Sequence, residues 1–245
     1  MKIAGITAFV TGANGDIGQY YIEALRDLGA ARIYAAARKT SALQDIVAGD
    51  RDRIIPIALD ITDESSVKAA VKECQEVSLL VNNAGIGLRQ GFISPQDLSA
   101  ARGEMEVNYF GTLNMCRAFA PILKNNGGGA IVNMISILGR VNFPFNASYG
   151  ASKAAAFLMT QGIRAELAAQ NTLVVGVLPG TVDTPGSHDF PPPKVSPQAV
   201  AREALQGVID GVEDVYPGEQ AKEMEAQLRS EPKALEKAMG AMLSK

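Results

Sequence analysis

The chain has 245 residues, a length that α/β folds often use for one core, and we expect a single domain over residues 1–245. Hydrophobic residues make up 47% and charged residues 20% of it, which excludes the composition of a disordered chain. With 23 Lys and Arg against 26 Asp and Glu, the net charge of −3 gives no broad positive field. We therefore expect neither a nucleic acid nor a membrane as partner.

Two cysteines and one histidine give neither a disulfide framework nor the ligand spacing of a zinc site. The stretch 125–139, which has no charged residue, is interrupted by asparagines and glycines, so it does not read as a membrane span. These features favour a cytoplasmic protein without a bound metal.

Short apolar runs bounded by turn residues predict buried strands, and segments with helical periodicity lie between them. In chain order, strands are predicted at 6–10, 32–37, 54–58, 79–81, 130–135 and 173–178, and helices at 17–28, 65–77, about 98–123, and 149–169. Strand and helix alternate throughout. This order predicts a doubly wound α/β fold, in which one parallel sheet carries helices on both faces as in the Rossmann fold.

Beyond residue 178 the pattern changes, because five prolines lie between 185 and 197. Proline fits neither a helix interior nor a central strand, so we expect a loop at about 181–197. Ser196 and Pro197 then predict a helix N-cap and first turn, and that helix runs toward Gly211. A short strand at 214–216 and a charged C-terminal helix at about 219–242 follow.

The first strand leads into a glycine-rich turn before the first helix, with Gly12, Gly15 and Gly18 three residues apart. Glycines allow the backbone to approach a pyrophosphate, and the helix N-terminus supplies free N–H groups. A glycine triplet alone could be only a tight turn. Between the first strand and the first helix of an alternating chain, it favours a dinucleotide site.

The end of the second strand indicates which dinucleotide binds. An NAD site usually has an acidic residue about 20 residues after the glycine turn. Here residues 33–39 contain no Asp or Glu, and the strand ends in Arg38 and Lys39. A guanidinium can bind a 2′-phosphate with two parallel hydrogen bonds, so NADP(H) is favoured over NAD(H).

Tyr149 and Lys153 are four residues apart at the start of a predicted helix, so both side chains project from one face. A phenol with a pKa near ~10 is a poor proton-transfer group at neutral pH, and an adjacent ammonium is expected to lower that pKa. Taken alone, such a pair is usually a solvated helix face. Its neighbours in the sequence favour catalysis.

With this pair the sequence resembles the short-chain dehydrogenase/reductase family, in its compact single-domain branch. The resemblance extends from Thr11 to about Tyr216. The motifs that carry it occur in the family's order: the glycine turn, Leu59-Asp60-Ile61, Asn82-Asn83-Ala84-Gly85, Asn108, Ser136, Tyr149-Gly150-Ala151-Ser152-Lys153 and Pro179-Gly180. It implies a nicotinamide-dependent oxidoreductase.

The resemblance also implies a role for each catalytic residue. Tyr149 would donate a proton in carbonyl reduction and accept one in alcohol oxidation. Ser136 would hydrogen-bond the same substrate oxygen. Lys153 would bind the nicotinamide ribose and tune Tyr149, and Asn108 would hold a water that connects Lys153 to solvent.

The cofactor-binding residues follow from the same resemblance. Asp60 would contact the adenine, the segment 83–85 would line the cofactor groove, and the segment 179–184 would pack along the nicotinamide. The full expected set is Gly12, Asn14, Gly15, Asp16, Ile17, Gly18, Arg38, Lys39, Asp60, Ile61, Asn83, Ala84, Gly85, Tyr149, Lys153, Pro179, Gly180, Val182 and Thr184.

The glycine turn departs from the compact branch in one respect. That branch has glycine or alanine where this chain has Asp16, and the glycine at Gly15 gives the spacing of the extended branch. Extended members include enzymes that modify nucleotide sugars, but they carry a larger C-terminal domain than the 65 residues that follow Gly180. A nucleotide-sugar epimerase or dehydratase therefore stays as one alternative, and a non-catalytic dinucleotide sensor as another.

The implied substrate pocket is mostly apolar. Its expected residues are Ser136, Leu138, Phe143, Phe145 and Tyr149, with further contributions from Ile86, Leu88, Ile137, Val141 and the loop at 181–194. No arginine pair or metal-ligand set is evident for holding a carboxylate or phosphate. We expect a small apolar ketone, aldehyde or secondary alcohol as the substrate. By resemblance, the helices after Asn108 and Tyr149 would form a homodimer or homotetramer.

Overall fold

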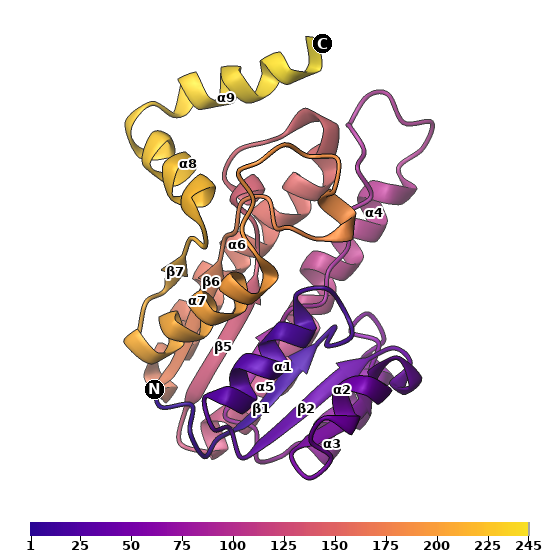
Figure 1. Ribbon diagram of the computed structural model, residues 1–245, viewed down its shortest axis with the longest axis vertical. Coiled ribbons are helices and arrows are strands. Elements are labelled where there is room, and N and C mark those ends of the chain that lie inside the picture. The colour runs from indigo at the N-terminus through magenta and orange to yellow at the C-terminus, as the bar shows by residue number, and fades with distance from the viewer. Residues whose placement is uncertain (245) are drawn as a thin grey trace.

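The computed structural model describes residues 1–244, which fold around a seven-stranded sheet in the order β3-β2-β1-β4-β5-β6-β7. Every neighbouring pair of strands is parallel. The strands are β1 (Thr7–Thr11), β2 (Arg32–Ala37), β3 (Ile54–Ala58), β4 (Leu79–Asn82), β5 (Gly129–Met134), β6 (Thr172–Val177) and β7 (Asp214–Val215). Figure 1 shows the sheet and its helices, and the predicted α/β fold with one parallel sheet is confirmed.

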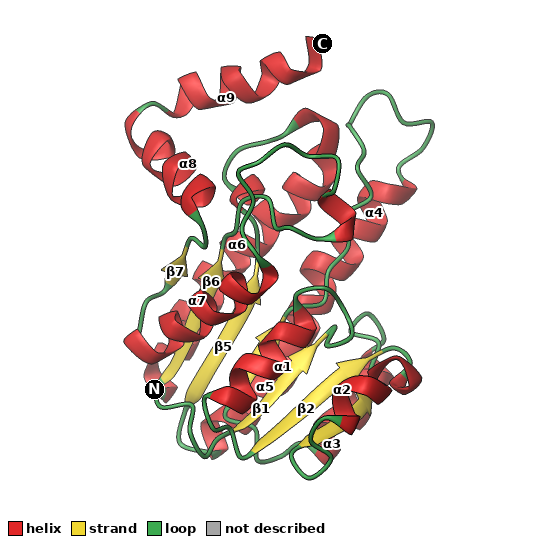
Figure 2. Cartoon of the chain, viewed as in Figure 1, coloured by secondary structure: helices red, strands yellow, loops and turns green. Residues whose placement is uncertain are grey.

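Helices cover both faces of this sheet (Figure 2). Residues of α1, α2 and α7 pack on one face, and residues of α3, α5 and α6 pack on the other. The helices are α1 (Gly18–Asp27), α2 (Gln44–Ala48), α3 (Glu64–Glu73), α4 (Ser99–Met105), α5 (Thr112–Asn125), α6 (Ala147–Leu167), α7 (Pro197–Asp210), α8 (Glu219–Ser230) and α9 (Pro232–Gly240).

The apolar runs of the sequence are buried on both sides, as parallel strands require. In β1, Ala8 and Val10 belong to the core beneath α1 and α7, whereas Phe9 belongs to the core beneath α3 and α5. The ring of Phe9 lies 4.9 Å from that of Phe119 on α5, measured between centroids. Alternation along the strand therefore supplies both cores from one continuous apolar segment.

The order in which the chain adds strands reverses at β1: β2 and β3 are added on one side of it, and β4 to β7 on the other. In open α/β sheets the crevice at such a point, outside the carboxyl ends of the strands, is where ligands bind. The segments that follow β1, β4, β5 and β6 meet at this edge, and the helices α8 and α9 stand above it (Figure 1).

Two predicted helices are built differently. The run predicted at 98–123 consists of α4, a π-helical segment Glu106–Gly111 and α5. The predicted C-terminal helix at 219–242 is two helices, because Glu231 leaves helical geometry with φ −140° and ψ 59° and Pro232 begins α9. Proline lacks the N–H that would continue α8 and clashes with the preceding turn. The short helix α2 was not predicted.

The predicted loop at 181–197 is an ordered excursion between β6 and α7. Val182 and Val195 form an isolated parallel bridge, and the N–H of Asp183 donates to the carbonyl of Val195 at 2.8 Å. The hydroxyl oxygen of Ser196 accepts from the N–H of Ala199, which confirms the predicted N-cap of α7.

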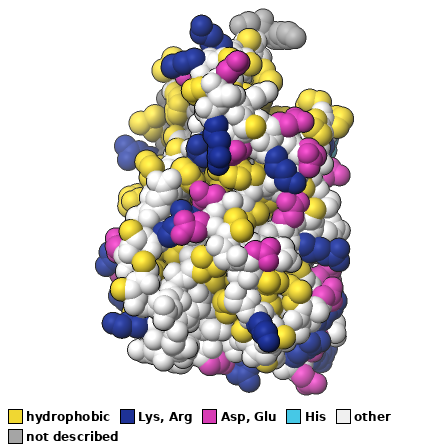
Figure 3. Space-filling view, turned by 90° about the vertical axis from the view of Figure 1, so that its left-hand side faces the viewer, with side chains coloured by type: hydrophobic (Ala, Val, Ile, Leu, Met, Phe, Trp, Pro, Cys, Tyr) yellow, Lys and Arg dark blue, Asp and Glu magenta, His cyan; other side chains and the backbone are white. Residues whose placement is uncertain are grey.

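Charged side chains of both signs are interspersed over the face in Figure 3, in keeping with a net charge of −3. No helix within the described residues 1–244 has both the length and the apolar character needed to cross a bilayer.

Candidate active site

The turn between β1 and α1 forms the first part of the site. Gly12 has a left-handed φ of +62°, and a Cβ there would lie 2.9 Å from the Cα of Ala84. At Gly18, where α1 begins, a Cβ would lie 2.1 Å from the carbonyl oxygen of Gly12. Both positions therefore require glycine. The tight turn brings the N-terminus of α1, with its partial positive charge, to the edge of the sheet, where an anion can bind.

Residues after β4 hold this turn in place. The side-chain amide of Asn83 donates to the carbonyls of Thr11 at 3.0 Å and Gly12 at 3.1 Å. In return, the hydroxyl oxygen of Thr11 accepts from the backbone N–H groups of Asn83 at 2.9 Å and Ala84 at 3.0 Å. The Asn-Asn-Ala-Gly motif thus binds one side of the glycine turn, a structural task that the sequence analysis did not foresee.

Two adjoining cavities occupy the carboxyl edge of the sheet. The glycine-turn cavity has a volume of about 410 Å³, and the Tyr149 cavity has a volume of about 550 Å³. They share lining residues at the start of α1, after β4 and in the 181–197 loop: Asp16, Ile17, Asn83, Gly85, Ile86 and Thr184. A ligand longer than either cavity can therefore extend from one into the other.

Most of the predicted cofactor-binding residues line these cavities. Around the glycine turn lie Gly12, Asn14, Gly15, Asp16, Ile17, Arg38, Asp60, Ile61, Asn83, Ala84 and Gly85. Around Tyr149 lie Lys153, Pro179, Gly180, Val182 and Thr184. Neither cavity includes Gly18, which lies beneath the turn, or the exposed Lys39. Arg38 is exposed at the end of β2 and lines the glycine-turn cavity.

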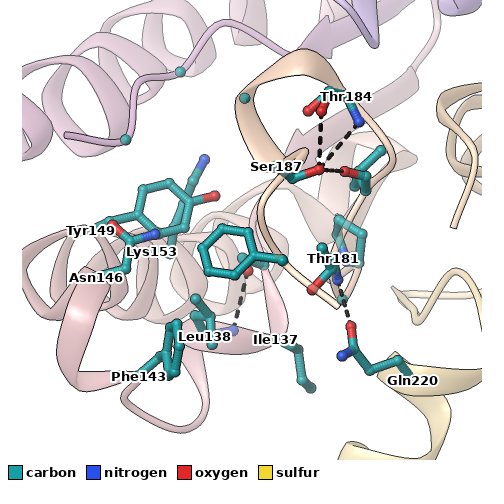
Figure 4. A pocket seen from close by; sticks show the side chains of 18 of the residues that line it. Ile137, Leu138, Phe143, Asn146, Tyr149, Lys153, Thr181, Thr184, Ser187 and Gln220 are labelled. Carbon is teal, nitrogen blue, oxygen red and sulfur yellow. Dashed lines mark hydrogen bonds between the residues drawn. The ribbon is translucent and has the colours of Figure 1, made fainter. Parts of the chain in front are cut away.

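Tyr149 and Lys153 lie one turn apart on α6, and both line the Tyr149 cavity (Figure 4). The ammonium nitrogen of Lys153 is 5.6 Å from the centroid of the Tyr149 ring and donates to the carbonyl of Met134 at 2.7 Å. Its side chain is buried, with only 4% of the residue exposed. The helix therefore presents a phenol and a buried cation to the same space.

Ser136 completes this group. It follows β5, is almost fully buried and lines the same cavity as Tyr149. Its hydroxyl oxygen accepts from the N–H of Leu138 at 3.2 Å, which leaves its proton free to be donated elsewhere.

Burial dominates the ionisation of the phenol and the ammonium. It raises the pKa of Tyr149 to about 12, while a hydrogen bond with Ser136 acts in the lowering direction and the charge of Glu104 raises the pKa further. Burial also lowers the pKa of Lys153 to about 8. The pKa of Tyr149 is therefore above its ordinary value and not below it, as the sequence had led us to expect, because loss of hydration dominates. Tyr149 is a protonated donor at neutral pH.

Asn108 lies in the π-helical segment and is almost fully buried. Its amide nitrogen donates to the carbonyl of Ile86 at 2.8 Å and to the hydroxyl of Ser152 at 2.9 Å. Its carbonyl oxygen accepts from the N–H of Ile86 at 2.9 Å and can accept one further hydrogen bond. Gly85 separates this oxygen from Lys153, since a Cβ there would lie 3.0 Å from the Asn108 oxygen and 3.4 Å from the Lys153 nitrogen.

Comparison with known families matches residues 6–194 to the short chain dehydrogenases. An uncharacterised oxidoreductase of Staphylococcus saprophyticus is 32% identical over 209 residues, which cover 81% of this chain and 88% of the relative. The chain belongs to the short-chain dehydrogenase/reductase family.

Two further relatives of this short-chain dehydrogenase are described with their cofactor. A crystal structure of a short chain dehydrogenase from Burkholderia cenocepacia J2315 in complex with NADP shares 45% sequence identity, covers 98% of this chain and 99% of that one, and superposes with a TM-score of 0.92. An NADP-dependent 3-hydroxy acid dehydrogenase of Schizosaccharomyces pombe is 27% identical over 191 residues, covering 75% of this chain and 74% of the relative.

The substrate side of this short-chain dehydrogenase only partly follows the sequence-based set. Leu138 and Phe143 line the Tyr149 cavity with Ser136, whereas Phe145 does not. Phe145 is 48% exposed, and its ring lies edge-on to that of Phe143 at 5.6 Å. Val141 and Leu88 also lie outside the cavity.

Several residues that the sequence analysis did not assign line this cavity: Arg89, Asn146, Gln220, Met224, Met239 and Met242. Four of them belong to α8, α9 and the turn that ends the described chain. The N–H of Thr181 donates to the side-chain carbonyl of Gln220 at 2.6 Å, which ties α8 to the segment after β6. These four residues form one wall of the cavity. The methionines at 239 and 242, one helical turn apart, indicate an apolar helix face and are the sequence signal for this wall.

Proposed function

We propose that the protein is an NADP(H)-dependent oxidoreductase that transfers a hydride between the nicotinamide cofactor and a small apolar ketone, aldehyde or secondary alcohol. The observation that carries this proposal is the placement of the Tyr149 phenol and the Ser136 hydroxyl in a mostly apolar cavity that adjoins the glycine-turn cavity. Proton donor and oxygen-binding group thus lie where a dinucleotide extending from the glycine turn would end.

The proposed chemistry assigns a separate task to each side chain. A bound NADPH supplies the hydride. Tyr149 donates its phenolic proton to the substrate oxygen, and Ser136 donates a hydrogen bond to the same oxygen as negative charge develops there. The buried ammonium of Lys153 stabilises the phenolate that remains. Asn108 keeps a free acceptor position on its carbonyl oxygen, across Gly85 from Lys153, and there it holds a water that connects Lys153 to solvent for proton resupply.

Arg38 supports the choice of NADP(H). It lines the glycine-turn cavity at the carboxyl end of β2, and the strand contributes no carboxylate. The relatives that are described with NADP fit the same choice.

The cofactor choice is tested by titrating NADPH and NADH into the protein at one ionic strength. A charge-assisted contact of this kind contributes about 1.5–3 kcal/mol, so Arg38→Leu should weaken NADPH binding by roughly ten- to a hundredfold. Lys39→Leu is the matched control, because Lys39 is exposed beside Arg38 but lies outside the cavity, and NADPH affinity should hardly change. Adding Ala37→Asp to Arg38→Leu should reverse the preference. Equal binding of the two cofactors by the wild type would contradict the choice of NADP(H).

We further propose that the protein assembles as a homodimer or homotetramer. Of the apolar side chains on the central helices, Met115 and Phe119 are core residues. Leu158 on α6 is 66% exposed, and this supports the outer face of α6 as the contact between copies.

A further inference from the structure

The segment that follows Gly85 connects the catalytic tyrosine to the 181–197 loop. Gly87 packs against Tyr149, since a Cβ there would lie 3.3 Å from the ring. The next N–H, that of Leu88, donates to a carboxylate oxygen of Glu104 at 2.6 Å. Glu104 is 0% exposed, and its second oxygen has no hydrogen-bond partner among the described residues. A buried carboxylate thus fixes the backbone directly before Arg89.

Arg89 reaches from this segment to the 181–197 loop. Its guanidinium donates two parallel hydrogen bonds to Asp189, at 2.7 and 2.9 Å, and a third to the carbonyl of Gly186. It also stacks on Phe190, with its central carbon 4.8 Å from the ring centroid. Its backbone has a left-handed φ of +54°, which non-glycine residues seldom adopt. An exposed ion pair usually contributes little, but bidentate geometry and stacking favour a defined contact here.

Of the two charged side chains in this ion pair, only that of Arg89 lines the Tyr149 cavity. Asp189 binds the guanidinium from outside the cavity. Asp183, the other acidic residue of the 181–197 loop, forms an ion pair with Lys194, with 3.6 Å between its carboxylate oxygen and the ammonium nitrogen. Arg140 does not line the cavity and donates to the hydroxyl of Tyr216. Asp189 is therefore the group that compensates the cation at the substrate end of the cavity.

We propose that Asp189 is a specificity-determining residue: by neutralising Arg89, it makes the cavity select uncharged carbonyl substrates over those that carry a carboxylate. An anionic substrate would have to displace a carboxylate that is already held by two hydrogen bonds within the same chain, so its binding gains little from Arg89. The same contact ties the 181–197 loop to the segment after β4. This inference rests on the proposed oxidoreductase function.

The test compares a neutral ketone with an analogue of equal length that ends in a carboxylate, each assayed with NADPH. In Asp189→Asn, the ratio of kcat/KM for the acid to kcat/KM for the ketone should rise about tenfold or more, because Arg89 becomes an uncompensated cation. Asp183→Asn is the matched control, since it removes a carboxylate of the same loop that does not bind Arg89, and its ratio should stay within about twofold of wild type.

Hydrogen exchange provides a readout independent of turnover. Amides of residues 184–195 should exchange faster in Asp189→Asn, and the charge-exchanged double variant Arg89→Asp/Asp189→Arg should restore part of the protection. An unchanged substrate ratio or unchanged exchange in Asp189→Asn would overturn the inference, as would a wild type that prefers the acid. Failure of the wild type to reduce any neutral ketone would instead contradict the proposed function.

Discussion

Tyr149 and Lys153 show how burial sets the protonation states that the proposed reaction needs. A phenol whose pKa rises to about 12 remains a proton donor throughout the neutral range, and an ammonium whose pKa falls to about 8 is still charged at pH 7. Spacing along the sequence predicted the pair and its shared helix face. It could not predict these shifts, because burial depends on β5, the segment after β4 and α4, which pack around α6 from distant parts of the chain.

The lowered pKa of Lys153 predicts a pH-dependent cost in stability. Between about pH 8 and about 10.5 the unfolded chain carries a proton on this amine that the folded chain has lost, so the free energy of unfolding rises with pH in that window. Relative to Lys153→Met, the wild type should gain up to about 1.4 kcal/mol per pH unit above pH 8. Urea unfolding of both proteins at pH 7, 8 and 9 measures this.

Subtracting the stability of the variant from that of the wild type removes the contributions of Tyr149 and of the buried thiols of Cys74 and Cys116, which titrate in both proteins. A stability difference that stays constant from pH 7 to pH 9 would show that burial does not lower the pKa of Lys153. The variant should also lose most reductase activity, because the phenolate formed from Tyr149 is no longer stabilised.

The helical run from α4 to α5 is the element that joins the two parts of the site. Its π-helical segment Glu106–Gly111 carries Asn108 toward Lys153 and lets Gly111 pack against Ile61, which lines the glycine-turn cavity. A π-helical turn inserts an extra residue into the helix, and such turns are frequent at functional sites. Helical periodicity predicted one continuous helix here, because an apolar pattern does not reveal one inserted residue.

Glycine-to-alanine substitutions at two positions of this run should have opposite effects. A Cβ at Gly111 would lie 2.7 Å from two carbons of Ile61, so Gly111→Ala should cost about 1–3 kcal/mol of stability and weaken NADPH binding. At Gly103 in α4 a Cβ meets nothing within 4 Å, so Gly103→Ala should stabilise the protein by about 0.5–1 kcal/mol. Thermal unfolding and NADPH titration measure both effects. Equal stability of the two variants would refute the close packing inferred at Gly111.

For the molecule as a whole, local sequence patterns predicted the sheet and the residues at its carboxyl edge. Alternating strands and helices were sufficient for the parallel sheet, and the glycine turn, Ser136 and Tyr149 follow predicted strands or begin predicted helices at its carboxyl edge. The wall formed by α8 and α9 was not predicted as part of the substrate cavity. Met224 and Met239 come to lie there through the packing of α8 and α9 above the sheet; the spacing of the methionines indicates an apolar helix face but not which cavity that face lines.

The break between α8 and α9, at Glu231 and Pro232, was also not predicted from the sequence. Proline at the first position of α9 was visible in the sequence, but the charged, periodic segment around it predicted one helix. After this change of direction α9 runs across the top of the molecule in Figure 1, and its residues Leu235 and Met239 pack with Leu138 and Phe143. Met239 also lines the Tyr149 cavity.

The central claim is that Tyr149 donates the proton in an NADPH-dependent reduction. Its most direct test is the rate of NADPH oxidation with a panel of neutral ketones and aldehydes, measured for wild type, Tyr149→Phe and Tyr34→Phe. Tyr34 is the control, because its hydroxyl binds Glu76 and lies outside both cavities. We predict turnover by wild type and Tyr34→Phe and a loss of at least about a hundredfold in Tyr149→Phe with NADPH affinity retained. More than about a tenth of the wild-type rate in Tyr149→Phe would contradict the claim, since positioned acid–base groups usually contribute far more.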